Sequence, residues 1–172
     1  MAGRERLFFA LLPPPAIQAE LGRLGAWGER RCGGHAVATE NIHLTLLYLG
    51  EVAPGTTATA REAATVRRFA PFEVTLDRIE YWPGPRLYCA VPAAPVPGAA
   101  ALAASLRAAV RGGVVPPERR FAAHVTLLRR PRRLHEVPML PLAWMVNEYC
   151  LMSSRRLGGE LHYVPIDSWS CT

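Results

Sequence analysis

The four residues His43-Leu44-Thr45-Leu46 occur again, with one conservative change, as His124-Val125-Thr126-Leu127. We call residues 43–46 the first motif and residues 124–127 the second motif. In an extended strand, side chains alternate between two faces, so each copy places its histidine and threonine on one face and its aliphatic residues on the other. Two such strands facing each other would form a cleft with paired acid–base groups and paired hydroxyls. This arrangement suits phosphoryl chemistry.

The repeat extends beyond the motifs. Arg6-Leu7-Phe8-Phe9-Ala10-Leu11 is echoed by Arg86-Leu87-Tyr88-Cys89-Ala90-Val91, and each motif follows its landmark at nearly the same separation. Matched landmarks at constant spacing indicate a duplicated strand–helix–strand unit, covering about residues 5–50 and 85–130. We therefore expect one bilobal domain over residues 1–172. Its fold class is α+β, with two pseudo-symmetric lobes of mainly antiparallel sheet flanking a central cleft and helices on the outer faces.

The composition is that of an ordinary globular protein. Half of the 172 residues are apolar, and no apolar run approaches the roughly 18 residues that span a bilayer. The four cysteines are scattered, which predicts reduced thiols. We expect a cytoplasmic monomer with no obligate protein partner and no membrane association. The net charge of +6 is carried by arginine alone, because the chain contains no lysine, and it is compatible with a polyanion such as RNA.

Hydrophobic periodicity and turn residues predict seven or eight strands and two or three helices. Strands are expected at 5–12, 37–39, 41–49, 72–77, 86–91, 121–129, 146–153 and 161–166, and helices at 15–31, 56–69 and 98–111. Proline favours the start of the first helix, and Gly112-Gly113 marks the end of the third.

His43 and His124 are the strongest catalytic candidates. An unperturbed imidazole pKa of about 6.5 lets one histidine act as an acid and the other as a base near neutrality. Thr45 and Thr126 can donate hydrogen bonds to phosphate oxygens as charge builds up. The chain has no His-x-His or His-Glu-x-x-His, and both motifs lack carboxylates, so a zinc site is the weaker alternative. We predict no metal and no other cofactor.

Four further residues are candidates for substrate binding. Arg129 lies at an odd offset from His124, which predicts the opposite face in a regular strand. Near a strand end that rule weakens, and Arg129 or Arg130 can still reach a phosphate; a solvated charge run is the alternative. Phe8 and Tyr88 occupy equivalent positions in the repeat and are the candidates for stacking on a nucleobase, although such residues more often belong to a core.

The two motifs, with Arg6-Leu7-Phe8-Phe9-Ala10-Leu11 and Leu47-Tyr48-Leu49-Gly50-Glu51-Val52, resemble the two-histidine phosphoesterase superfamily over nearly the whole chain. The most similar branch comprises the bacterial and archaeal RNA 2′,3′-cyclic phosphodiesterases, also called 2′-5′ RNA ligases. The resemblance implies two pseudo-symmetric α+β lobes around a cleft, with one motif from each.

The resemblance also implies the chemistry. A terminal 2′,3′-cyclic phosphate of RNA would be opened to a 2′-phosphomonoester, without a metal or nucleotide cofactor. His43 would protonate the departing 3′ oxygen, His124 would activate water, and Thr45, Thr126 and Arg129 would hold the phosphate. The residues alone do not assign acid and base. Two other functions stay open: 2′-5′ ligation as the main role, and noncatalytic binding of RNA ends.

Overall fold

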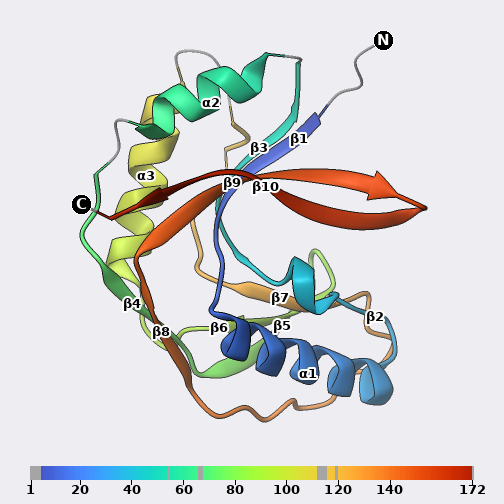
Figure 1. The fold of residues 1–172 in the computed structure, drawn as a ribbon. Coiled ribbons are helices and arrows are strands. Elements are labelled where there is room, and N and C mark those ends of the chain that lie inside the picture. Colours follow the sequence, from blue (N-terminus) through green and yellow to red (C-terminus); the bar gives the residue numbers. More distant parts are fainter. Residues whose placement is uncertain (1–4, 54, 66–67, 112–115, 119, 172) are drawn as a thin grey trace.

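The computed structural model describes residues 5–53, 55–65, 68–111, 116–118 and 120–171. Over these ranges the chain forms ten strands, three α-helices and one 3₁₀ helix (Figure 1). In chain order the elements are β1 Glu5–Leu11, α1 Pro15–Cys32, β2 His35–Ala36, η1 Thr39–Asn41, β3 Leu44–Val52, α2 Thr56–Thr65, β4 Phe72–Leu76, β5 Arg78–Trp82, β6 Leu87–Val91, α3 Pro97–Val110, β7 Val125–Arg129, β8 Leu142–Val146, β9 Glu148–Leu157 and β10 Glu160–Ser170.

Most strands belong to one antiparallel sheet of eight strands. Its order is β10-β9-β1-β3-β7-β6-β5, and the short β2 pairs with β7. Strands β1 and β3 of the first repeat lie on one side of the β3–β7 junction, and β6 and β7 of the second repeat lie on the other; the short β2 crosses to the second side. At that junction a single register pair, Leu44 with Val125, connects the two motif strands. A separate two-stranded sheet pairs β4 with β8.

The helices of the two repeats are exchanged between the halves. Helix α1 follows β1 but packs on β7, and α3 follows β6 but packs on β3. The approach of α1 to β7 is close: a Cβ added at Gly25 would lie 2.8 Å from the carbonyl oxygen of Leu127. Each motif strand is therefore backed by the helix of the other repeat, and the two halves form one interlocked unit.

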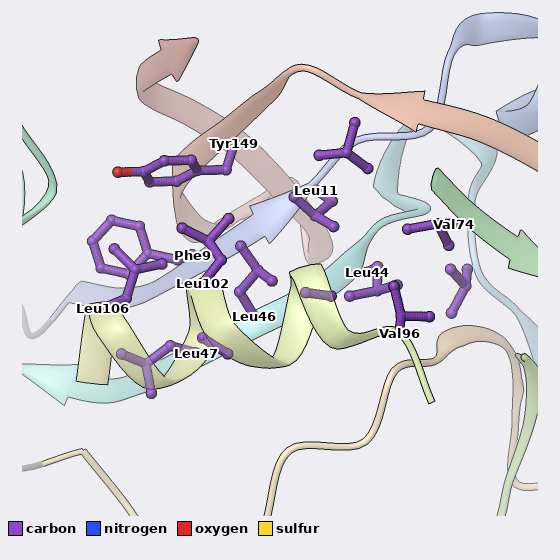
Figure 2. Packing of buried hydrophobic residues seen from close by; sticks show 14 of the residues in the cluster. Phe9, Leu11, Leu44, Leu46, Leu47, Val74, Val96, Leu102, Leu106 and Tyr149 are labelled. Atoms are coloured by element: carbon purple, nitrogen blue, oxygen red, sulfur yellow. The ribbon is translucent and has the colours of Figure 1, made fainter. Parts of the chain in front are cut away.

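The main core lies between α3 and the strands of the first half. Leu102 and Leu106 of α3 lie against Phe9 and Leu46, with Tyr149 of β9 at the edge of the cluster (Figure 2). All five side chains are buried. Because each buried aliphatic or aromatic side chain contributes on the order of 1.5–3 kcal/mol, this packing holds the motif strand β3 firmly in place.

The structure confirms the α+β class, the three helices and most of the expected strands. The expected strand at 37–39 is wrong, because this segment turns through η1 and pairs only at His35–Ala36. Both motif strands begin later than expected, at Leu44 and Val125, so each histidine precedes its strand by one residue. The expected second helix ends at Thr65, and residues 66–67 of that prediction lie outside the described chain.

Strands β5 and β8 were not expected from the sequence. Strand β8 is defined by its register with β4, which is distant in sequence. Strand β5 forms a hairpin with the next strand, β6, in which Trp82 pairs with Leu87. No helix in the described ranges is long and apolar enough to cross a membrane.

Candidate active site

The two motifs meet at the centre of the sheet. In an antiparallel ladder, paired residues point to the same face and their neighbours point to the other face. Because Leu44 pairs with Val125, the histidines and threonines on either side of them all point to the opposite face. These four side chains line one groove with a volume of about 810 Å³. The structure thus brings His43, Thr45, His124 and Thr126 together.

His43 is held by hydrogen bonds at both ring nitrogens. Its Nδ1 lies 2.7 Å from the carbonyl oxygen of Asn41, and its Nε2 lies 2.9 Å from Oγ1 of Thr45. A carbonyl oxygen only accepts, so Nδ1 carries the proton and Nε2 faces the groove. The rings of Phe8 and Tyr163 flank the imidazole, each with its centroid 4.9 Å away. His43 is therefore fixed in orientation within an aromatic enclosure.

His124 repeats part of this arrangement. Its Nδ1 donates to the carbonyl oxygen of Ala122 over 2.8 Å, which again turns Nε2 toward the groove. Its ring neighbour is Trp82 at the end of β5, with centroids 4.5 Å apart. The indole Nε1 of Trp82 donates to the carboxylate of Glu80 over 3.3 Å. The second histidine thus has one indole neighbour, and that indole is linked to an acidic group.

Burial depresses the pKa of both histidines. For His43, desolvation lowers the pKa to about 4, helped by the positive charge of Arg129 and by that of His124 when it is protonated, and opposed by the hydrogen bond to Asn41. Desolvation is also the largest cause of the lowered pKa of His124, again with Arg129 acting in the same direction. Both imidazoles are therefore neutral near pH 7, and Nε2 of each is the nitrogen that can take up a proton.

Matching β-bulges lie at the last residue of each motif. Thr45 pairs with Ala10 and Leu47 with Phe9, so Leu46 is the extra residue on β3. In the second half, Thr126 pairs with Cys89 and Leu128 with Tyr88, so Leu127 is the extra residue on β7. A bulge inserts one residue and reverses the alternation of faces beyond it.

The second bulge explains the position of Arg129. In a regular strand its odd offset from His124 would turn it away from the histidine. The extra residue at Leu127 returns Arg129 to the same face, and its side chain lines the groove with that of Arg130. Tyr48 occupies the same position after the first bulge and lines the groove from the other half.

The expected equivalence of Phe8 and Tyr88 is wrong by one residue. The register pairs Phe9 with Leu47 and Tyr88 with Leu128, so Phe9 and Tyr88 are the matched pair. Tyr88 accordingly lies on the face away from the groove. It is 5% exposed, and its hydroxyl donates to the carbonyl oxygen of His135. Tyr88 is therefore a structural residue.

Phe8 does line the groove, but it is 4% exposed and packs against His43 and Tyr163. Most of its surface is covered by the protein, so Phe8 forms part of the wall that encloses the imidazole.

Several residues near the histidines were not expected from the sequence: Tyr48 and Tyr163 line the groove, and Trp82 contacts the ring of His124. A signal existed for Tyr48, which follows its histidine by the same five residues that separate Arg129 from His124. No local signal marks Trp82 or Tyr163, because hairpins distant in sequence bring them to the histidines. Among the described residues, no group of three or more His, Cys, Asp or Glu side chains is arranged to hold a metal ion.

The chain matches known proteins over almost its whole length. The RNA 2′,3′-cyclic phosphodiesterase of Escherichia coli K12 is 32% identical over 175 residues, covering 100% of this chain and 99% of the relative. The protein of the same name from Thermus thermophilus is 31% identical, covering 87% of this chain and 81% of its own length.

Solved structures agree. E. coli LigT complexed with 3′-AMP superposes with a TM-score of 0.89 at 31% identity, covering 98% of this chain and 99% of that one. A family model described as the 2′-5′ RNA ligase superfamily matches residues 13–157. This agrees with the resemblance drawn from the two motifs. The chain therefore belongs to the 2′-5′ RNA ligase superfamily.

Proposed function

We propose that the protein is an RNA 2′,3′-cyclic phosphodiesterase that opens a terminal cyclic phosphate to a 2′-phosphomonoester. The observation that carries this proposal is the meeting of both motifs at the Leu44–Val125 pair, which aims two imidazoles into one groove. The activity named for the E. coli and T. thermophilus relatives supports it.

The two histidines divide the proton transfers. Nε2 of His124 takes a proton from the water that attacks phosphorus. The P–O3′ bond breaks, and His43 delivers a proton from Nε2 to the departing 3′ oxygen, leaving a 2′-phosphate and a 3′-hydroxyl. Each transfer is typically worth about 10²–10⁴-fold. Hydroxyls of Thr45 and Thr126 and the guanidinium of Arg129 hold the nonbridging oxygens as charge develops.

Substrate binding makes His43 take up the proton that it needs, and the proton comes from solvent. With a pKa of about 4, His43 is neutral near pH 7, because it is desolvated and lies near the cationic Arg129. A bound phosphodiester anion reverses the local charge and raises the imidazole pKa. His43 is then protonated at Nε2, so it can act as an acid only when a phosphate is bound.

The groove has the charge of an RNA-binding surface. Six arginines line it, and no Asp or Glu from the described ranges does so: Arg6, Arg107, Arg120, Arg129, Arg130 and Arg156. Arg6 is ion-paired with Glu51 outside the lining. Guanidinium groups bind phosphate oxygens in bidentate geometry. This set extends on both sides of the histidines, so it suits an RNA chain as well as a single nucleotide, with Arg130 among the phosphate contacts.

We infer that the whole chain acts as one bilobal, monomeric domain in the cytoplasm, without a metal. The exchanged helices favour a single unit. All four cysteines are free, which suits a reducing compartment.

The test is incubation of an RNA bearing a 2′,3′-cyclic phosphate with the purified protein, followed by identification of the new end. A 2′-monophosphate supports the proposal, and a 3′-monophosphate contradicts it. Addition of an RNA with a 5′-hydroxyl tests 2′-5′ ligation, because that hydroxyl can replace water at the same site. Binding without any turnover would instead indicate an RNA-end-binding protein.

A further inference from the structure

We propose that Asn41 is a positioning residue for the reaction, which ties the β9–β10 hairpin to His43 and so sets the orientation and enclosure of that imidazole. This inference rests on the proposed function. It concerns a side chain that lies outside both motifs and does not line the groove.

The amide of Asn41 binds the free edge of the sheet. Strand β10 is the last strand and pairs only with β9, so its outer edge carries unpaired backbone groups. Nδ2 of Asn41 donates to the carbonyl oxygen of Leu161 over 2.7 Å, and the N–H of Tyr163 donates to Oδ1 of Asn41 over 3.0 Å. One amide thus makes the pair of hydrogen bonds that a neighbouring strand would make.

The backbone of the same residue holds the histidine. The carbonyl oxygen of Asn41 accepts the Nδ1 proton of His43 over 2.7 Å. The ring of Tyr163, whose backbone N–H is held by the side chain of Asn41, lies perpendicular to the imidazole at an interplanar angle of 88°. Asn41 is 8% exposed, so these contacts are sheltered from water. One residue therefore connects the acceptor at Nδ1 with the ring that covers His43.

In the described part of the second half, no side chain makes the corresponding link between a hairpin and the histidine. Ala122, two residues before His124, supplies the same carbonyl contact but has no side chain that reaches a strand. The ring beside His124 comes from β5 and depends on the β5–β6 hairpin. The hairpin that Asn41 anchors contributes Arg156, Leu161 and Tyr163 to the groove. A substrate that contacts this hairpin is therefore connected to His43 through Asn41, and not to His124.

The test is Asn41→Ala, with turnover of a cyclic-phosphate RNA and NMR titration of both histidines as readouts. We expect kcat to fall on the order of 10²-fold, the size of effect produced by small misplacements of a catalytic group, with a much smaller change in KM. Looser packing of Tyr163 lets water reach the imidazole, so the titration of His43 should move from a pKa of about 4 toward 6.5. Arg129 and His124, the charged groups acting on His43, stay in place, and the titration of His124 should not move.

Glu40→Ala is the matched control, because Glu40 is an exposed neighbour on η1. It should leave kcat and both titrations unchanged. Tyr163→Leu is the second variant, and it keeps the backbone hydrogen bond to Asn41 while removing the ring. It should shift the His43 titration in the same direction.

An unchanged kcat and an unmoved His43 titration in a folded Asn41→Ala protein would overturn the proposal. Equal shifts of both histidines would do so too, because they would indicate general loosening of the fold. If Asn41→Ala does not fold, the Tyr163→Leu titration decides in the same way. The titrations need no turnover, so failure of the proposed activity and failure of the positioning role give different results.

Discussion

The two halves of the groove share a backbone plan and differ in what surrounds the histidine. His43 lies between Phe8 and Tyr163, and the sheet row beside it continues from Thr45 to Ala10 and Cys150. His124 lies beside Trp82, and its row continues from Thr126 to Cys89 and Glu80. The first environment is apolar, and the second contains a carboxylate. The duplication therefore repeats the geometry of the imidazoles without repeating their electrostatics.

This difference affects how readily each histidine binds and releases a proton. The pKa of His43 is depressed to about 4 mainly because the imidazole is desolvated, with Arg129 and the protonated form of His124 acting in the same direction. The pKa of His124 is lowered by burial and by Arg129 alone. An acid with so low a pKa holds its proton only beside an anion, and then releases it readily. The apolar half thus suits the acid that protonates the leaving oxygen.

The largest loss of activity is expected when either imidazole is removed. His43→Ala and His124→Ala should each lower kcat on the order of 10³-fold or more, because both proton transfers are needed in one displacement. The assay follows the opening of a cyclic-phosphate RNA, with circular dichroism to verify the fold. A variant that retains a near-wild-type rate would exclude its histidine from the mechanism. The double variant should be little worse than either single one.

The position that follows the bulge is Arg129 in the second half and Tyr48 in the first, and substitution of Arg129 tests what its charge contributes. Arg129→Ala should reduce kcat/KM by about 10²-fold, since one donor to the transition-state charge is lost. Arg129→Lys should recover only part, because ammonium cannot bind in bidentate geometry. Arg133→Ala is the matched control from the exposed loop outside the groove. An equal loss in both alanine variants would indicate that net charge alone matters.

The pH dependence of stability should separate the two histidines. An unfolded histidine binds its proton near pH 6.5, and folded His43 resists protonation down to about pH 4. Between these values the unfolded chain binds more protons, so the stabilising contribution is complete above pH 6.5 and is lost as the pH falls. Urea unfolding at pH 7 and pH 4 measures how far the free energy of unfolding drops between these two values. In His43→Gln this drop should be smaller than in the wild type by about 3 kcal/mol.

His124→Gln should remove less, because its environment is less strongly desolvating. A larger effect at position 124 than at position 43 would reverse the ranking of the two sites.

The smallest expected effect is that of a chelator. If His43 and His124 act as acid and base rather than as metal ligands, activity should be unchanged after dialysis against EDTA. A separate Zn²⁺ addition serves as the control for inhibition by excess metal. Loss of activity with EDTA and recovery with Zn²⁺ would support the zinc site and contradict the assignment of the two histidines as acid and base.

Much of the fold could be predicted from the chain because its signals are local. The doubled His-x-Thr pattern places polar and apolar side chains on opposite faces, and prolines at residues 15 and 97 mark the starts of two helices. Strand β8 could not be predicted in the same way, because it pairs with β4, which is distant in sequence. Strand β5 pairs with the next strand, β6, in a hairpin, and its residues lie in a stretch for which no strand was expected.

The sequence by itself determined that His43, Thr45, His124 and Thr126 form two equivalent polar faces, because strand alternation is a property of the local backbone. Only the tertiary structure decided which other side chains reach them. The bulge at Leu127 turned Arg129 into the groove, and a register one residue away from the apparent repeat turned Tyr88 out of it. The Asn41 amide joined a distant hairpin to His43. These features depend on hydrogen bonds between segments far apart in the chain, which no local pattern specifies.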